Sequence, residues 1–295
     1  MKGKVILGTA NFGLKYGIAN KKKLDRDEIF KILELARAEG IWGIDTAGVY
    51  GDAEEIIGEF FARRGKVFRV IGKLPRREYL DSRAVEDEIY GALKRMNISL
   101  IDSLLIHSFE TYKLYGKIII PALQTLCRDG VIGRYGVSVY HPEEAEHVVR
   151  ETHDNLAIEF PLNLFDQRFL SDNFMQTFKT RGHLLFARSV FLQGLFFLDN
   201  RGLEGNFRKV GKQLRRIRDI SESHSMRPEC LALLFAISKS QVDGVVIGVD
   251  SAEQFLSNRE CFSDVSCGKF KQVESLLPDL AVYDEDIILP YRWKA

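Results

Sequence analysis

The feature that most constrains the fold is a regular alternation of short β-branched runs with helical stretches along the whole chain. Eight strand-like runs occur; seven lead into a helical segment, and the eighth precedes SAEQFLSNRECF. Such alternation is typical of parallel strands joined by helical crossovers. The predicted strands are residues 4–10, 43–47, 68–74, 102–108, 134–140, 156–162, 183–190 and 243–249.

The stretches between these runs have helical spacing of apolar residues. Helices are predicted at residues 26–40, 83–97, 118–130 and 142–153, and Asp25 with Glu28 is spaced like a capping box before the first.

Eight such units in 295 residues predict a closed (β/α)8 TIM barrel, taken as one domain of residues 1–295. The rival fold, an open doubly wound sheet, would carry a glycine-rich fingerprint after its first strand. The segment GTANFG does not match that fingerprint.

Composition narrows the function classes. The net charge of +1 gives no reason to expect a nucleic-acid or membrane partner. No apolar run approaches the roughly 20 residues of a membrane span, and the N-terminus does not resemble a signal peptide. The four cysteines are scattered without metal-ligand spacing, so we expect free thiols, no metal and a cytoplasmic location.

Polar side chains follow the second, third and fourth predicted strands. In a barrel of this kind the active site lies at the carboxyl ends of the strands, which here supply Asp45, Tyr50, Lys73 and His107. A carboxylate keeps a buried lysine charged, and an ammonium lowers the pKa of a neighbouring phenol. Tyr50 would then protonate a carbonyl oxygen that His107 orients, while a nicotinamide or similar cofactor supplies hydride.

Four segments in this order, GIDTAGVYGDAE, VIGKL, LLIHS and GVS, resemble the aldo-keto reductase superfamily. The similarity extends from LGTANFG to VVIGVDSAEQFLSN, most of the chain. The resemblance implies a (β/α)8 barrel, carbonyl reduction by NADPH or NADH without a metal, and a catalytic tetrad of Asp45, Tyr50, Lys73 and His107. It also implies cofactor contacts at Thr9, Asp45, Ser138, Arg188, Ser189, Gln193, Gly194, Gly248, Asp250, Gln254 and Asn258.

Some positions depart from the family pattern. Val139 stands where an asparagine is usual, Ala157 where a glutamine is often found, and Arg188 where an aromatic ring commonly stacks on the nicotinamide. Glu159 and Asn163 are nearby candidates to replace the missing amides.

The segment after the last strand bears on the choice of dinucleotide. Most members of the superfamily prefer NADPH and bind its 2′-phosphate with basic residues there. Here the corresponding positions are Gly248, Asp250 and Gln254, although Arg259 is near enough in sequence to reach back. Because a carboxylate repels a phosphate, Asp250 predicts NADH or poor discrimination. Ser251 is placed to cap the following helix.

Two other functions stay open at this stage: a non-catalytic or regulatory barrel that binds a nicotinamide cofactor, and an aldolase that uses Lys73 to form a Schiff base. The expected partner is a small carbonyl compound, and the sequence carries no signal for an oligomeric state. A basic segment, residues 206–224, is expected outside the barrel with its charges in solvent. Candidate substrate-pocket residues are Phe12, Tyr16, Trp42, Phe109, Tyr140, Phe160 and Phe191.

Overall fold

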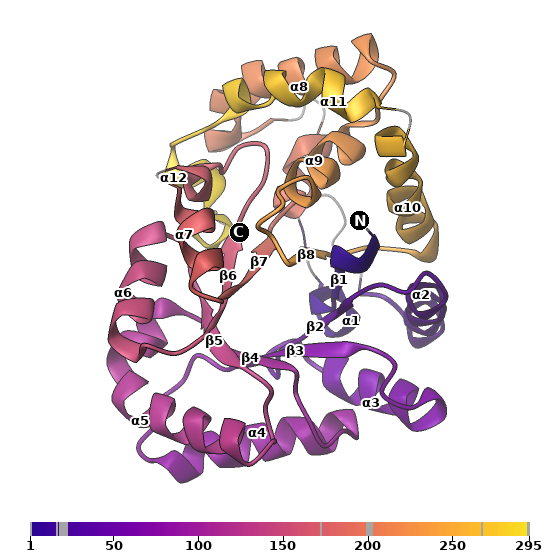
Figure 1. The fold of residues 1–295 in the computed structure, drawn as a ribbon. Coiled ribbons are helices and arrows are strands. Elements are labelled where there is room, and N and C mark those ends of the chain that lie inside the picture. Colours follow the sequence, from indigo (N-terminus) through magenta and orange to yellow (C-terminus); the bar gives the residue numbers. More distant parts are fainter. Residues whose placement is uncertain are drawn as a thin grey trace.

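Eight parallel strands close into a barrel in which β1 pairs with both β2 and β8 (Figure 1). The computed structural model describes residues 2–15, 17, 23–171, 173–198, 203–266 and 268–293. Each strand lies within a range predicted from the sequence, so the (β/α)8 prediction is confirmed. The strands are β1 Val5–Gly8, β2 Gly43–Asp45, β3 Arg69–Leu74, β4 Ser103–Ile106, β5 Tyr135–Ser138, β6 Ala157–Pro161, β7 Leu184–Arg188 and β8 Gly244–Ile247.

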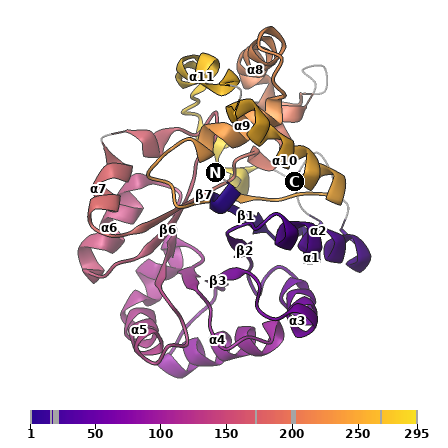
Figure 2. The same cartoon turned by 45° about the vertical axis from the view of Figure 1, so that its right-hand side comes forward.

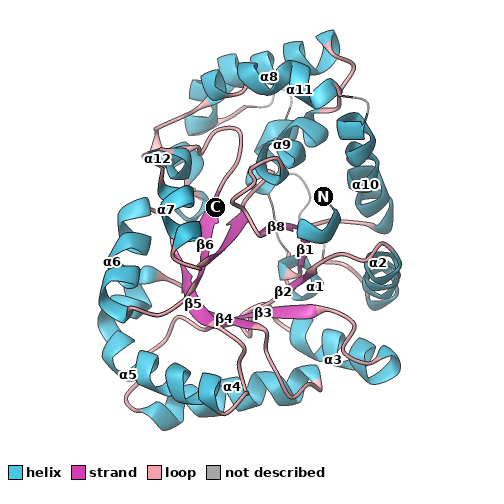
Figure 3. Ribbon diagram, in the orientation of Figure 1, coloured by secondary structure: helices cyan, strands magenta, loops and turns pink. Residues whose placement is uncertain are grey.

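Helices surround the barrel on its outer side (Figure 3). No helix within the described ranges is long and apolar enough to cross a membrane. The α-helices are α1 Ala10–Gly13, α2 Arg26–Ala38, α3 Ala53–Arg64, α4 Ser82–Met96, α5 Phe109–Arg128, α6 Pro142–Thr152, α7 Phe174–Thr180, α8 Gly211–Ser223, α9 Pro228–Ile237, α10 Ala252–Ser266, α11 Lys269–Val273 and α12 Glu285–Ile288. The 3-10 helices are η1 Lys2–Lys4, η2 Arg168–Leu170, η3 Leu192–Phe197, η5 Gly205–Val210, η6 Glu274–Leu276, η7 Pro278–Leu280 and η8 Pro290–Arg292.

The expected capping box at α2 is only half formed. Asp25 accepts a hydrogen bond from the amide of Glu28 at 2.8 Å, as predicted. The Glu28 carboxylate, however, accepts from the amide of Ala252 at 2.7 Å. Because that amide lies in the first turn of α10, Glu28 joins two helices instead of closing its own cap.

Helix α5 begins at Phe109, well before the predicted residue 118. Its start is set by Ser108, whose hydroxyl accepts a hydrogen bond from the amide of Thr111 at 3.2 Å. The helix therefore follows β4 almost directly, and it continues through Pro121.

The basic segment lies outside the barrel, as expected. Its helix α8 buries Leu214, Ile217 and Ile220, and both views place it beside α11, beyond α9 (Figures 1 and 2). Arg218 is half-buried, and the other basic side chains of the segment are exposed, namely Arg208, Lys209, Lys212, Arg215 and Arg216.

A layer of apolar side chains fills the barrel interior towards the amino-terminal ends of the strands. Trp42 packs against this layer, with its ring centre 5.4 Å from that of Phe186. The guanidinium of Arg69, the first residue of β3, lies 5.0 Å from the Trp42 ring centre. Trp42 is therefore at the amino-terminal end of the barrel, and its assignment to the substrate pocket is wrong. The layer comprises Ile6, Ile71, Leu105, Ala157 and Phe186.

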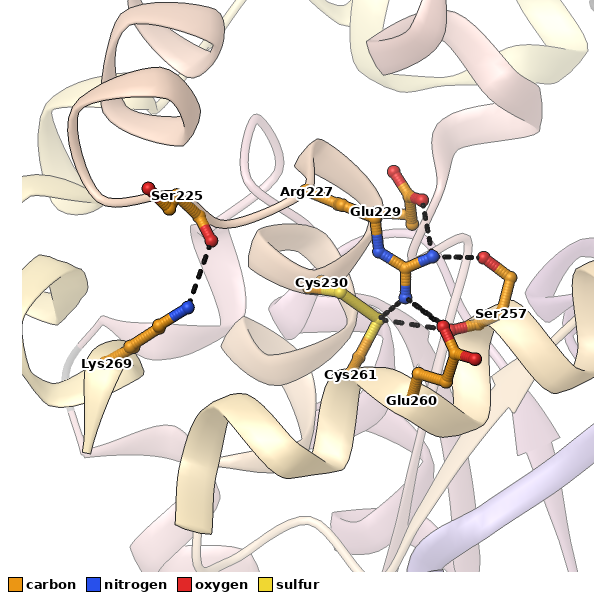
Figure 4. The surroundings of a disulfide bond; sticks show 8 residues. All are labelled: Ser225, Arg227, Glu229, Cys230, Ser257, Glu260, Cys261 and Lys269. Atoms are coloured by element: carbon orange, nitrogen blue, oxygen red, sulfur yellow. Dashed lines mark hydrogen bonds and ion pairs between the residues drawn. A yellow bond between two sulfur atoms is a disulfide. The ribbon is translucent and has the colours of Figure 1, made fainter. Parts of the chain in front are cut away.

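The expectation that all cysteines are free is wrong for one pair. Cys230 in α9 and Cys261 in α10 form a disulfide (Figure 4). Cys127 is free, and Cys267 lies outside the described residues. The cytoplasmic prediction rested partly on free thiols and loses that support.

Arg227 reinforces the same helix pair. Its guanidinium donates to the hydroxyl of Ser257 and, at 2.6 Å, to the main-chain oxygen of that residue (Figure 4). It also forms ion pairs with Glu229 and Glu260 at 3.5 and 3.7 Å. These bonds link the start of α9 to α10, the helix that follows β8.

Candidate active site

A cavity of about 380 Å³ opens at the carboxyl ends of the strands. Among the described residues, no cluster of His, Cys, Asp and Glu could hold a metal ion there or elsewhere. Every strand contributes to the wall, through Gly8, Asp45, Lys73, His107, Ser138, Glu159, Arg188 and Ile247, each within its strand or directly after it.

Strand periodicity explains why these polar side chains enter the cavity. Side chains alternate between the two faces of a strand, so a residue two positions beyond an inward-facing one also faces inward. Lys73, His107, Glu159 and Arg188 each follow a member of the apolar layer by two positions. They therefore form the next layer up, at the barrel mouth.

On strand six, this layering separates Ala157 from Glu159, one of the two residues considered as a replacement for the missing amide. Ala157 belongs to the apolar layer and does not reach the cavity. Glu159 pairs in register with Ser138 and accepts a hydrogen bond from its hydroxyl at 2.9 Å. The side chain of β6 that faces Ser138 is thus the Glu159 carboxylate, two positions after Ala157.

A lysine shared by two carboxylates forms the buried centre of the site. The Lys73 ammonium bonds both carboxylate oxygens of Asp45 and lies 3.3 Å from Oε2 of Glu159. Burial alone would lower the pKa of Lys73, but the two carboxylates outweigh it and raise that pKa well above its usual range. The two carboxylates therefore favour the charged form of Lys73.

The two carboxylates differ in their environment. Burial raises the pKa of Asp45 against the pull of Lys73, and repulsion from Glu159 adds to the rise. Burial also opposes ionisation of Glu159, but Lys73 and Arg188 together hold its pKa below the usual value. Glu159 differs from Asp45 in having Arg188 as a second cationic neighbour, at 3.4 Å.

Tyr50 and His107 lie beside this centre. The Lys73 ammonium is 5.9 Å from the centre of the Tyr50 ring, and the rings of Tyr50 and His107 are 6.2 Å apart at 87°. Burial and the charges of Lys73 and Arg76 lower the pKa of His107 to about 3. The structure therefore brings the four expected residues to one cavity, with the histidine neutral near pH 7.

Two glycines hold the Tyr50 loop against the loop after β1. A methyl carbon added at Gly13 would lie 1.7 Å from the carbonyl oxygen of Tyr50. Gly51 has a φ of +61°, and a methyl carbon there would lie 2.7 Å from the Gly13 oxygen. The two loops can lie in contact only because neither glycine has a side chain.

All the expected cofactor contacts line the cavity except Asn258. It lies one helical turn beyond Gln254, in a separate small pocket with Arg259. Arg259 is held there by an ion pair with Glu39 at 2.8 Å. The cavity is lined by Thr9, Asp45, Ser138, Arg188, Ser189, Gln193, Gly194, Gly248, Asp250 and Gln254.

Arg188 is fixed against one wall. Its guanidinium donates to the main-chain oxygen of Val139 at 3.0 Å and to the hydroxyl of Ser138 at 3.3 Å. It lies 4.2 Å from the Tyr140 ring centre and 3.4 Å from a Glu159 oxygen. These contacts, with a further hydrogen bond to the Ser189 hydroxyl at 3.2 Å, orient the Arg188 side chain at the mouth of the cavity.

Asn163, considered as a cofactor contact, instead stabilises the main chain near the cavity. Its amide donates to the main-chain oxygen of Ser189 at 3.1 Å, and its oxygen accepts from the amides of Phe165 and Asp166. Asn163 is absent from the cavity wall and orders the turn after β6.

The loop after β7 has an unusual backbone. Ser189, Leu192 and Gln193 have φ values of 58°, 45° and 53°, in the left-handed region. Such residues cost about 1 kcal/mol or more each and concentrate at functional sites. Their position on the wall of the cavity fits a loop shaped for a ligand.

At the β8 end of the cavity, the side chains of the wall form hydrogen bonds with one another and with the main chain. Ser251 accepts a hydrogen bond from the amide of Gln254 at 3.0 Å, which confirms the predicted cap. The Gln254 oxygen accepts from the amide of Asp250 at 2.5 Å. Asn11 donates to the Asp250 carboxylate at 3.3 Å and to the carbonyl of Val249.

The candidate pocket aromatics divide into three groups. Tyr140 and Phe191 line the cavity. Phe12 and Phe160 are fully buried in the outer core, and Phe109 packs against Tyr112 away from the cavity wall. Tyr16 lies outside the described residues.

The cavity wall also contains residues that sequence reasoning missed. Tyr291 comes from the C-terminal segment and packs on Tyr140 with ring centres 4.7 Å apart. No local pattern signals that contact. The other missed wall residues include Asn11, Arg76, Phe197 and Pro290.

These observations define a (β/α)8 barrel whose mouth holds a tyrosine, a histidine and a lysine shared by two acids. Residues 4–277 match the family model described as the aldo/keto reductase family, and the chain belongs to this family. Membership supports an oxidoreductase.

Relatives agree with this placement. The chain is 24% identical over 278 residues to aldo-keto reductase str7 of Strobilurus tenacellus. The aligned region covers 85% of this chain and 79% of that protein. It is 24% identical over 263 residues to the uncharacterised oxidoreductase YqkF of Bacillus subtilis, with 79% and 82% covered. The holo form of aldo-keto reductase AKR11C1 from Bacillus halodurans superposes with a TM-score of 0.77 at 19% identity, covering 96% and 94% of the two chains.

Proposed function

We propose that the chain is a nicotinamide-dependent reductase that converts an aldehyde or ketone, a sugar among the possible substrates, into an alcohol. The observation that carries the proposal is a single cavity that joins two kinds of wall. Tyr50, Lys73 and His107 line one part and suit proton transfer, while Asp250 and Gln254 line another and suit the polar groups of a dinucleotide.

Unpaired polar atoms support a bound polar ligand. Oδ1 of Asn11 and Nδ1 of His107 are buried and have no hydrogen-bond partner among the described residues. Buried polar atoms in proteins are normally paired. We assign the dinucleotide to the wall that contains Ser138, Ser189 and Asn11; when bound, its nicotinamide supplies hydride to the carbonyl carbon.

The chain's own residues manage the proton. Tyr50 transfers its phenolic proton to the carbonyl oxygen as negative charge develops there. The Lys73 ammonium, kept charged by Asp45, favours the phenolate that remains. Neutral His107 donates a hydrogen bond to the same oxygen and fixes its position.

The aldolase alternative is disfavoured by the same charges. A lysine forms a Schiff base only as a free amine, and the pKa of Lys73 is raised by its two carboxylates. The regulatory-barrel alternative predicts cofactor binding without turnover.

A consumption assay of NADH and NADPH over aliphatic aldehydes, aromatic aldehydes, ketoses and keto-sugars tests the proposal. Tyr50→Phe should lower turnover by about 10²–10⁴-fold, the value of one general acid. Cofactor affinity, followed by fluorescence quenching, should not change. A Tyr50→Phe variant with near wild-type turnover would refute the mechanism, and borohydride trapping of substrate on Lys73 would favour the aldolase.

We infer NADH, or weak discrimination, as the cofactor preference. Asp250 places a carboxylate on the wall near the start of α10. Arg259, the basic side chain near enough in sequence to reach back to a phosphate, is paired with Glu39 in a different pocket.

A further inference from the structure

The charged side chains of the cavity wall are unequally paired. Lys73 bonds Asp45 and lies 3.3 Å from Glu159, and Arg188 lies 3.4 Å from Glu159. Arg76 is also on the wall and forms no ion pair with any residue in the described ranges. The catalytic end of the cavity therefore retains one uncompensated positive charge.

Arg76 lies beside the histidine, and its side chain is exposed at the edge of the cavity. It follows β3 by two positions, and its guanidinium donates to the main-chain oxygen of His107 at 3.5 Å. Burial, Lys73 and then Arg76 lower the pKa of His107, so the guanidinium acts on this ring through space. The third carboxylate of the wall, Asp250, follows β8, whereas Arg76 and His107 follow the adjacent strands β3 and β4.

Aromatic side chains supply the remaining surface near the mouth. Tyr140, Phe191, Phe197 and Tyr291 line the cavity, with Tyr291 packed on Tyr140. These rings can cover an organic group of moderate size, but none offers a charge. Lys73 and Arg188 already face carboxylates, so Arg76 is the wall residue left to bind an anionic substituent of the substrate.

We propose that the substrate is an aldehyde or ketone that carries an oxyanion group, a carboxylate or a phosphate, and that Arg76 binds this group. The inference rests on the proposed function for the position of the carbonyl oxygen, at Tyr50 and His107. A guanidinium presents a planar fork of donors that matches an oxyanion. Arg76 is thereby a specificity-determining residue and takes no part in proton transfer.

Matched aldehydes test this assignment. The probes are 4-carboxybenzaldehyde, its neutral isostere 4-carbamoylbenzaldehyde, and 4-formylphenyl phosphate. Arg77→Gln is the control, because Arg77 is adjacent and exposed like Arg76 but pairs with Glu88 at 3.1 Å and does not line the cavity. Arg76→Gln should lower kcat/KM for the better anionic aldehyde by about tenfold, as for one charge-assisted hydrogen bond. The carbamoyl compound should be unaffected, and Arg77→Gln should match wild type.

The outcomes separate the two anions and the rival roles. A loss confined to the carboxylate or to the phosphate identifies which of the two the site takes. Equal losses for the charged and neutral aldehydes would overturn the proposal, and so would a matching loss of NADH affinity, which would assign Arg76 to the cofactor.

A binding measurement keeps the inference distinct from the proposed reaction. Calorimetry with benzoate, phenyl phosphate and benzamide requires no turnover. Arg76-dependent binding of either anion without reduction of any aldehyde would leave the anion site standing and refute the reaction. Reduction of aldehydes without an anion preference, together with anion binding that does not depend on Arg76, would support the reaction and refute the anion site.

Discussion

The carboxylate of Glu159 lies 3.3 Å from the Lys73 ammonium, which also bonds Asp45. The sequence alone predicts only Asp45 as the partner of this lysine. A second buried carboxylate alters the charge balance around Tyr50, because it offsets part of the positive charge that favours a phenolate.

Glu159→Gln should therefore change the pH dependence of carbonyl reduction. The substitution preserves shape and removes one negative charge, so the phenol ionises more readily. The alkaline limb of kcat/KM should move to lower pH by about one unit. Glu110→Gln, an exposed carboxylate paired with Lys113, is the control. An unmoved limb would show that Glu159 does not influence the proton donor.

His107 should stay neutral throughout the working pH range. Burial first, and then Lys73 and Arg76, lower its pKa to about 3. Its imidazole proton signals in NMR should show no titration midpoint between about pH 5 and 8. A midpoint near 6.5 would contradict this environment.

The same shift gives a stability change with a defined sign. An unfolded histidine binds a proton below about pH 6.5, whereas folded His107 does so only near 3. The contribution of His107 is complete above pH 6.5 and is lost as the pH falls towards 3. At pH 5 the loss should be about 2 kcal/mol. Urea unfolding of His107→Gln should show a drop between pH 7 and 5 smaller than wild type by that amount.

Gly13→Ala should impair catalysis from outside the reacting groups. The added methyl group would meet the carbonyl oxygen of Tyr50, so the Tyr50 loop must move. A displacement near 1 Å can reduce turnover by about a hundredfold. Gly3→Ala is the control, since an added methyl group there has no neighbour within 4 Å. Wild-type turnover in Gly13→Ala, with a native circular dichroism spectrum, would contradict the contact.

Asp250→Arg should shift cofactor choice towards NADPH. Removal of a carboxylate and gain of a guanidinium should tighten NADPH relative to NADH by about tenfold, or 1.4 kcal/mol. Dissociation constants from fluorescence titration measure this ratio. An unchanged ratio would place Asp250 away from the ribose, and a wild-type preference of tenfold for NADPH would refute the NADH inference.

The disulfide should contribute measurably to stability. Cys230 and Cys261 are 31 positions apart in sequence, and a link of that length stabilises by about 3–4 kcal/mol in the chain-entropy model. A reductant should lower the urea midpoint of the wild-type protein but not that of Cys230→Ala/Cys261→Ala. Cys127→Ala, which removes a free thiol, should respond to the reductant like the wild type.

Local patterns in the sequence were enough to locate the strands and several site residues. Parallel barrel strands are buried on both faces, so each appears as a short apolar run that ends at a polar residue. Lys73 and His107 follow such runs and project into the cavity because of the two-residue period of a strand. The start of α5 was less visible, because one serine hydroxyl sets it.

Contacts between distant segments could only be decided by the closed barrel. Glu159 reaches Lys73 from three strands away, and the layer a residue occupies depends on the register between neighbours, which no local pattern encodes. The same holds for the pairing of Cys230 with Cys261, the position of Arg76 beside His107 and the exclusion of Asn258 from the cavity. The sequence by itself determined which residue types stand at the strand ends, because burial and periodicity are local. Only the tertiary structure decided which of them meet, because that depends on how eight strands tilt and close.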